Sequence, residues 1–435
     1  MKLFMQSLGC VKNQVDSEMI LGILKETIEF VEDPMDADLM LLNTCAFIEP
    51  ARKEAIDTIF ELVEVKKKNH AKIMVCGCLP QRYKDEIVQL IPEVDRFVTI
   101  DEYNALGQIV NQVLQSKYTF KKGLDPLEKI ITTPAYMRYV KISEGCMNRC
   151  AFCAIPLIRG NLKSRPIENI VEEVKGAVSE GAYEINLVAQ DTTGYGYDLY
   201  HRLALVDLLK QLLLIEGDFK IRLLYLYPEL VTDELIHLIK TNPKLMKYFD
   251  IPIQHSEDKL LKAMLRRSNK KMILDLMHKI KKEIPSATLR TTLMVGFPYE
   301  EEADVDQMID FIQEVQFDHM GAFTFSLEEN TPACKYPNLI TEDTKQRRYE
   351  RLMSAQAKIA LMLKQKKIGT CIENAFVIGY DAESFLYVAR SEEFAPDEID
   401  GCIYVAAKEE LKLGQRIHVK IVDADAYTLT GEQIV

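Results

Sequence analysis

The sequence predicts an α/β protein with an N-terminal doubly wound parallel sheet, a central partial α/β barrel and a small C-terminal antiparallel β-barrel. Strands alternate with helices over residues 1–118, the pattern of a parallel sheet with helices on both faces. A second strand–helix series, with six expected strands, fills most of residues 136–367. After Gly369 the pattern changes to short strands separated by turns, which indicates a small all-β unit.

In residues 1–118 the expected strands are short apolar runs, and the expected helices are amphipathic. The strands are residues 2–7, 38–43, 72–75 and 96–100, and the helices are residues 17–26, 51–67 and 84–90. Residues 121–134 are polar, irregular and contain proline. We therefore expect a linker over residues 119–135.

The central domain is expected over residues 136–367, and the C-terminal barrel over residues 370–435. The central strands are expected at 139–142, 184–188, 221–225, 248–251, 288–295 and 319–325, with helices such as 167–180 and 203–214 between them. A long helix over 344–367 has a basic face, which is either solvated or touches a partner. The expected C-terminal strands are residues 375–378, 384–388, 401–405 and 415–422.

Composition favours a soluble cytoplasmic protein that does not bind its partner mainly through phosphate contacts. The first residues lack the apolar core of a signal peptide, and no apolar run reaches the length of a membrane span. The net charge of −12 argues against a protein that binds mainly to phosphates. Residues 371–435 hold 13 Asp and Glu against 5 Lys and Arg, a net −8. This acidic segment indicates either a basic partner or a surface that keeps the protein soluble.

Cys146, Cys150 and Cys153 form a CxxxCxxC run shortly after the expected strand at 139–142. Four thiolates normally hold an iron–sulfur cluster, and no fourth cysteine is near in sequence. Three thiolates would leave one iron of a 4Fe–4S cluster open to S-adenosylmethionine (SAM). The alternatives are a chance grouping or a zinc site, but zinc knuckles use CxxC pairs with a fourth Cys or His. A loop at a strand end is also where α/β folds place their chemistry.

Cys10, Cys45 and Cys78 each follow an expected strand of the N-terminal sheet. The C-terminal ends of parallel strands share one edge, so these thiols can converge on a second cluster with one open iron. Each cysteine alone is an ordinary small buried residue. Cys76 would share a strand face with Cys78, but Cys78 is favoured because it follows Gly77 at the turn. We expect the three scattered cysteines to be structural: Cys334, Cys371 and Cys402.

Five blocks of sequence resemble the radical-SAM methylthiotransferases, and the resemblance extends over essentially the whole chain. They are residues 7–18, residues 143–160 with Ser164 and Arg165, residues 187–192, residues 250–255 and residues 290–298. The resemblance implies an N-terminal methylthiotransferase domain, a radical SAM domain and a C-terminal TRAM domain. It also implies two 4Fe–4S clusters and SAM as cofactors.

Within this family the sequence is most similar to the group that methylthiolates an aspartate of small-subunit ribosomal protein S-twelve. Residues 12–18, 143–146 and 189–192 carry that similarity, and Val11 departs from it where the group often has proline. The sister group modifies an adenosine beside the tRNA anticodon and has a Gln-Met-Asn type stretch after the first cysteine. The acidic C-terminal segment suits a basic ribosomal protein better than RNA.

The resemblance also implies roles for individual residues. The cluster on Cys146, Cys150 and Cys153 would generate the radical that abstracts hydrogen from the aspartate β-carbon. The cluster on Cys10, Cys45 and Cys78 would present sulfur, and a second SAM would supply the methyl group. Phe152 would pack beside the SAM adenine, and Gly296 would admit a close approach of the ligand. Gln254 and Arg290 either contact SAM or serve in barrel packing and ion pairs, and His255 is expected to be structural.

Two alternatives stay open at this point. The first is the tRNA enzyme, which the basic helix at 344–367 and the expected barrel domain keep open. The second is an iron–sulfur carrier, which would need no SAM site, whereas the turn at 296–298 resembles one. The enzyme would also need an electron donor and a sulfur donor, and the sequence identifies neither.

Overall fold

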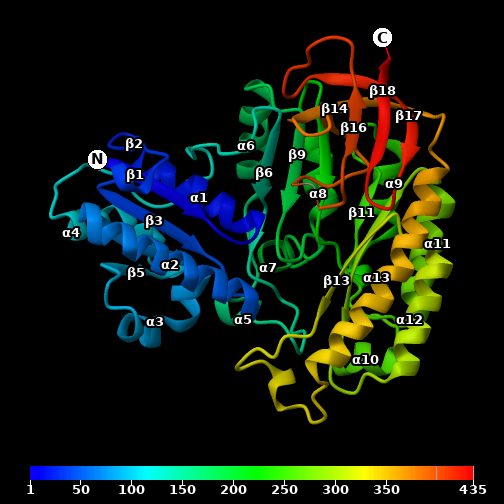
Figure 1. The fold of residues 1–435 in the computed structure, drawn as a ribbon, viewed down its shortest axis with the longest axis horizontal. Coiled ribbons are helices and arrows are strands. Elements are labelled where there is room, and N and C mark those ends of the chain that lie inside the picture. The colour runs from blue at the N-terminus through cyan, green and yellow to red at the C-terminus, as the bar shows by residue number, and fades with distance from the viewer. Residues whose placement is uncertain (398, 435) are drawn as a thin grey trace.

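The computed structural model describes residues 1–397 and 399–434 and confirms the α/β architecture in three parts. Glu398 and Val435, both in the acidic C-terminal segment, lie outside the described residues. Figure 1 shows the N-terminal sheet in blue, the central barrel in green to yellow, and the C-terminal barrel in red. None of the helices in the described part of the chain is long and apolar enough to cross a membrane.

The N-terminal unit is a five-stranded parallel sheet of order β2-β1-β3-β4-β5. The strands are β1 (Lys2–Ser7), β2 (Glu29–Phe30), β3 (Leu39–Thr44), β4 (Lys72–Gly77) and β5 (Arg96–Val98). The helices are α1 (Val11–Leu24), α2 (Glu49–Asn69), α3 (Cys78–Leu90) and α4 (Leu106–Leu114), with short 3-10 turns at Pro34–Asp36 and Ile100–Ala105.

Alternating side chains of this sheet face opposite helix layers, which makes the sheet doubly wound. Leu39 and Leu41 pack with residues of α1 and α4, whereas Met40 and Leu42 pack with residues of α2. α1 begins at Val11, earlier than the expected residue 17. Its first turns carry buried polar residues such as Asn13 and Asp16, which contact other parts of the protein and obscure the amphipathic pattern.

The central unit is an open parallel barrel made of two three-stranded sheets, β6-β9-β10 and β11-β12-β13. All six expected strands are present: β6 (Met137–Lys141), β9 (Glu184–Val188), β10 (Lys220–Leu223), β11 (Tyr248–Asp250), β12 (Thr288–Val295) and β13 (His319–Thr324). Backbone hydrogen bonds join β10 to the segment of β11, from Met246 N to Ile221 O (2.9 Å) and from Leu226 N to Asp250 O (2.9 Å).

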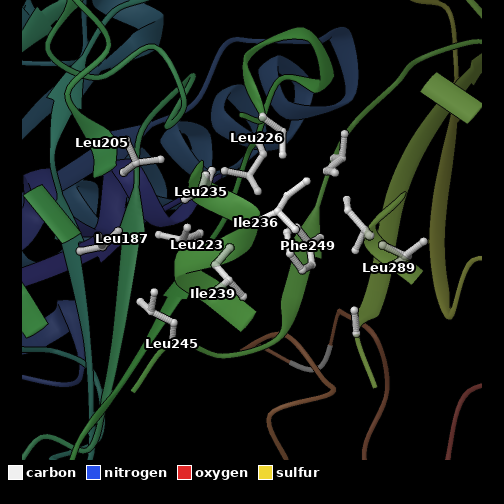
Figure 2. Close-up of a cluster of buried hydrophobic side chains, with 14 of the residues drawn as sticks. Leu187, Leu205, Leu223, Leu226, Leu235, Ile236, Ile239, Leu245, Phe249 and Leu289 are labelled. Atoms are coloured by element: carbon white, nitrogen blue, oxygen red, sulfur yellow. The ribbon is translucent and has the colours of Figure 1, made fainter. Parts of the chain in front are cut away.

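Most helices of the central unit cover the outer face of the barrel, whereas the short helix α5 (Ile155–Ile158) packs against the N-terminal unit through Ile158. The other helices are α6 (Ile167–Ser179), α7 (Tyr197–Tyr200), α8 (Leu205–Leu213), α9 (Asp233–Thr241), α10 (Asp258–Ala263), α11 (Lys270–Glu283), α12 (Glu302–Val315) and α13 (Glu342–Gln365), with β7 (Ser143–Glu144), β8 (Lys163–Ser164) and 3-10 turns at Pro228–Leu230 and Pro332–Lys335. Figure 2 shows Leu187, Leu223, Phe249 and Leu289 of four strands packed near Ile236 of α9.

The basic face of α13, expected over residues 344–367 to be solvated or to touch a partner, is only partly solvated: Arg347 is exposed and Arg351 is half-buried. Lys345 and Arg348 are buried. Arg348 pairs with Glu300 (2.8 Å) and Glu302 (2.9 Å), and Arg351 pairs with Glu302 (2.9 Å). The basic side chains therefore neutralise acids at and before the start of α12.

The C-terminal unit is a closed barrel of order β14-β15-β16-β18-β17. Its strands are β14 (Cys371–Asp381), β15 (Leu386–Arg390), β16 (Ile403–Ala406), β17 (Arg416–Ala424) and β18 (Leu429–Ile434). The fifth strand, β18, was not among the four expected strands. It pairs in parallel with β16 and antiparallel with β17, which closes the barrel.

The segment between β15 and β16 attaches the C-terminal barrel to the inner face of the central barrel. Arg390 and Arg222 both pair with Glu184, whose pKa they lower to about 2 although burial alone would raise it. Asp400 pairs with Arg290 and accepts a hydrogen bond from Tyr248 (2.5 Å). Near the first residues of the central strands, these buried charges lie beside an apolar cluster that includes Met137 and Tyr139.

We expect Glu184→Gln to lower the free energy of unfolding by about 3–5 kcal/mol, because it leaves two buried guanidinium groups without a carboxylate. Urea unfolding at neutral pH measures the change, with the exposed Glu216→Gln as the matched control. Because the pKa of Glu184 is depressed, its stabilisation is fully present above the pKa of an unfolded Glu and is lost as the pH falls toward 2. Equal stability of the two variants would contradict the prediction.

Candidate active site

A cavity of about 280 Å³ lies between the N-terminal sheet and the C-terminal ends of the central strands, and both predicted cysteine trios contribute to its wall. Cys10, Cys45 and Cys78 come from the N-terminal unit, and Cys150 and Cys153 from the central one. The other polar and aromatic residues of its wall are Lys12, Phe47, Phe152, Arg159, Gln190, Tyr225, Tyr227, Gln254 and Arg266. The structure therefore brings two thiol groups that are far apart in sequence to one enclosed space.

Two glycines with positive φ place the thiols of the N-terminal trio. Gly9, at φ +85°, precedes Cys10, and a Cβ on Gly9 would lie 2.4 Å from the Cβ of Cys45. Gly77, at φ +97°, precedes Cys78, and a Cβ there would lie 2.3 Å from an oxygen of Asn43. Only glycine permits these turns without a clash, so each turn delivers its cysteine to the cavity.

Cys76 differs from Cys78 in both position and chemistry. Cys76 lies within β4 and packs in the core on the α1 and α4 side of the sheet, whereas Cys78 lines the cavity. Burial raises the pKa of Cys76 to about 12, which makes it an unreactive thiol. The hydrogen bond between Cys78 and Cys45 lowers the pKa of Cys45 to about 7 and, together with burial, raises the pKa of Cys78 well above its usual range.

Arg159 connects the N-terminal trio to the central barrel. Its Nη2 lies 3.3 Å from Cys78 Sγ, and its Nη1 pairs with Asp16 of α1 (2.5 Å) and with Glu144 (3.2 Å). Lys141 of β6 also pairs with Asp16 and Glu144. The guanidinium group thus places positive charge beside thiols that must lose protons to bind a metal.

Each sulfur of the central trio has a hydrogen-bond partner, from the cysteine loop for Cys146 and Cys153 and from Tyr227 for Cys150. Cys146 Sγ accepts from the backbone N–H of Asn148 (3.4 Å) and from its side-chain amide (3.5 Å). Cys153 Sγ accepts from the N–H of Ile155 (3.4 Å), and Cys150 Sγ lies 3.3 Å from the hydroxyl of Tyr227. Such donors stabilise thiolate sulfurs and tune iron–sulfur clusters, so the loop fits that cofactor.

Asp191 gives the family-like block at residues 189–192 a structural role. Its carboxylate accepts a hydrogen bond from the side-chain amide of Asn148 (2.7 Å), the same residue that donates to Cys146. Thr193 and Gly194 hold the other oxygen of Asp191. Asp191 therefore orients the cysteine loop from the end of β9.

The thiol arrangement does not suit the zinc alternative. In residues 1–397 and 399–434, no three His, Cys, Asp or Glu side chains gather closely enough to hold one metal ion. Zinc requires its ligands at about 2.0–2.3 Å from a single centre. Thiols spread around a cavity instead match a group with several metal atoms.

Two of the four residues expected to hold SAM lie at the cavity. Phe152 lines it and packs edge-on against Phe297, with ring centroids 6.4 Å apart. Gln254 lines it too, in a left-handed backbone conformation at φ +72°. Gln254 Oε1 is buried and has no hydrogen-bond partner among the described residues, which leaves an acceptor available to a ligand.

The other two expected residues do not line this cavity. Arg290 pairs with Asp250 (2.9 Å) and Asp400 (3.0 Å), which is the structural ion pair expected as the alternative to a SAM contact. Gly296, at φ +77°, lies against Lys345, because a Cβ there would lie 2.3 Å from Cγ of that side chain. His255 is fully buried 3.4 Å from Glu300, an environment that suits a structural residue.

Sequence reasoning missed four cavity residues: Lys12, Tyr225, Tyr227 and Arg266. Arg266 Nη1 lies 3.8 Å from Cys150 Sγ, and its guanidinium group stacks on the ring of Tyr227 at 4.2 Å. The available signal was the position of the two tyrosines directly after β10, since strand ends of parallel sheets carry functional residues. No sequence pattern singles out Arg266.

Three family models match the chain. They are the uncharacterized protein family UPF0004 over residues 2–99, the radical SAM superfamily over residues 140–312 and the TRAM domain over residues 368–434. Among solved structures, the radical SAM methyltransferase TsrM from Kitasatospora setae aligns with a TM-score of 0.58 and 11% identity, covering 86% of this chain and 80% of that one. This likeness shows the fold alone.

Curated relatives match along their whole length. The ribosomal protein uS12 methylthiotransferase RimO of Geobacter sulfurreducens is 42% identical and covers 100% of this chain and 98% of its own length. The proteins of the same name from Carboxydothermus hydrogenoformans and Desulforamulus reducens are 43% and 44% identical, with 100% and 98% of each chain covered. With its SAM and 4Fe–4S chemistry, the chain belongs to the RimO family of radical SAM methylthiotransferases.

Proposed function

We propose that this protein adds a methylthio group to the β-carbon of an aspartate in small-subunit ribosomal protein S-twelve, the uS12 of its relatives' names. The observation that carries the proposal is one cavity lined by Cys10, Cys45 and Cys78 of the N-terminal trio and by Cys150 and Cys153 of the central trio. A methylthio transfer must remove a hydrogen and deliver sulfur at the same carbon. One enclosed space with two cofactor sites meets that requirement.

In this proposal Cys146, Cys150 and Cys153 hold one 4Fe–4S cluster, and Cys10, Cys45 and Cys78 hold the second. When bound, the clusters and SAM supply the radical that removes the hydrogen, together with the sulfur and methyl groups that replace it. Asn148, Ile155 and Tyr227 hold the sulfurs of the first trio by hydrogen bonds, and Arg159 balances charge at the second. We assign residues 1–118 to the N-terminal methylthiotransferase domain, 136–367 to the radical SAM domain and 370–435 to the TRAM domain. A linker over 119–135 joins the first two.

Phe152, Gln254 and Arg266 are the side chains that we assign to SAM. Phe152 offers an aromatic face for the adenine. Gln254 offers an unpaired oxygen, and Arg266 has no carboxylate partner among the described residues although it is buried beside Cys150. A guanidinium group in such a place suits the carboxylate of the methionine part.

The charge distribution supports a basic protein substrate over RNA. The closed C-terminal barrel belongs to an acidic segment of net −8, which attracts a basic ribosomal protein and repels phosphates. The basic side chains of α13, which favoured the tRNA alternative, are engaged by acids of this protein. The reaction also requires an electron donor and a sulfur donor. Because the proposed substrate is a ribosomal protein, we expect the enzyme to act in the cytoplasm.

Anaerobic reconstitution should load about eight iron atoms per chain, because each 4Fe–4S cluster holds four. Replacing Cys10, Cys45 and Cys78 together with Ala should reduce this to about four. Cys371→Ala, at an exposed thiol, and Cys76→Ala, at the core thiol, should keep the full iron content. Iron and sulfide assays measure the content. A value near four in the unmodified protein, unchanged in the triple variant, would rule out the second cluster.

Deleting the gene should remove one methylthio mass from protein S-twelve and leave tRNA nucleosides unchanged. Mass spectrometry of ribosomal proteins and of digested tRNA from the same cultures measures both. A plasmid copy should restore the modification, and a copy with Cys150→Ala should not. Loss of the methylthio group from tRNA instead of S-twelve would show that the substrate is an RNA.

A further inference from the structure

Lys12 is a cation in the cavity wall without an opposing carboxylate. It belongs to the first turn of α1, and its Nζ lies 3.5 Å from the ring centroid of Tyr225. Among the described residues, none forms an ion pair with it within 4.0 Å. The nearby carboxylate of Asp250 is engaged by Arg290 at 2.9 Å. Holding an ammonium group at a half-buried site without a paired carboxylate costs free energy that an incoming anion would offset.

The surroundings keep Lys12 in this place and add positive potential. Tyr225 has a left-handed backbone at φ +62°, a strained conformation for an aromatic residue. Its N–H donates to Asp250 (2.9 Å), and its carbonyl accepts from the N–H of Thr192 (3.1 Å). α1 begins at the cavity with Cys10 as its N-cap, without a side-chain cap and without an acid in its first turn. The positive end of the helix dipole therefore adds to the charge of Lys12.

The other cations of the cavity wall have different surroundings. Arg159 is neutralised by Asp16 and Glu144. Arg266 lacks a carboxylate but lies next to Cys150 of the SAM-binding trio, whereas Lys12 lies two residues after Cys10 of the other trio. Two cations without an ion-paired carboxylate, one at each cysteine trio, match a reaction that brings two carboxylates into one cavity. One is on the methionine part of SAM, and the other is on the substrate side chain.

We propose that Lys12 binds the side-chain carboxylate of the target aspartate and so selects aspartate as the residue to be modified. This inference rests on the proposed function above. It makes Lys12 a specificity-determining residue: the ammonium group holds the carboxylate and the adjacent β-carbon remains inside the cavity. A neutral side chain at this position would favour an uncharged target.

The test compares binding of two peptides that span the target site of S-twelve, one with the natural Asp and one with Asn in its place. Fluorescence anisotropy gives the Kd of each peptide for the reconstituted protein, for Lys12→Met and for Lys12→Arg. The matched control is Lys25→Met, an exposed lysine just past the other end of α1. Iron content and SAM cleavage without peptide are measured for every variant.

The unmodified protein should bind the Asp peptide about 10- to 100-fold more tightly than the Asn peptide, the range of a charge-assisted hydrogen bond. Lys12→Met should remove this preference and keep iron content and SAM cleavage, Lys12→Arg should retain part of it, and Lys25→Met all of it. A Lys12→Met protein that still prefers Asp overturns the inference, as does one that loses its iron together with the preference, because the lysine would then act on the cluster site and not on the peptide. If the unmodified protein neither binds nor modifies the Asp peptide, the proposed function fails first and the inference with it.

Discussion

The buried ion network around Arg159 is the interaction on which the shared cavity depends. Asp16 comes from the N-terminal unit, whereas Lys141, Glu144 and Arg159 come from the central unit. Taking these charges out of water is costly, and removing one member would leave the others without compensation. The network therefore favours a single placement of the N-terminal sheet, with its carboxyl edge against the mouth of the barrel. In that placement two cysteine trios more than sixty residues apart in sequence face the same space.

A second polar cluster has the same effect at the opposite end of the barrel strands. Glu184, Arg222, Tyr248 and Arg290 point inward and are met by Arg390 and Asp400 of the C-terminal unit. Apolar residues of the same strands, such as Phe249, face the outer helices (Figure 2). The interior of the barrel is thus closed by ion pairs together with an apolar cluster that includes Met137, Tyr139 and Val188. Both neighbouring units are fixed to the central barrel, one at each end of its strands.

Local patterns in the sequence were sufficient for the fold and for the cysteines, because strands are short apolar runs and cluster loops follow strand ends. They were insufficient where a contact between distant parts of the chain determines where a helix begins or whether its side chains are exposed. The start of α1 depends on Asp16 meeting Lys141, and the state of the basic face of α13 depends on Glu302.

The acidic charge of the C-terminal segment has two different uses, which a count from the sequence combines. Asp400 pairs with Arg290 and Arg390 pairs with Glu184, both at the interface with the central barrel. Neither charge therefore adds to the outer surface of the C-terminal barrel. Glu392 pairs with Lys220, and Glu393 with Lys367. The exposed acids lie on the strands and turns of the closed barrel: Glu373, Glu383, Glu409, Glu410, Asp423, Asp425 and Glu432. A basic partner would therefore be attracted to the barrel itself, while the acids of the β15–β16 segment keep that barrel attached beside the catalytic unit.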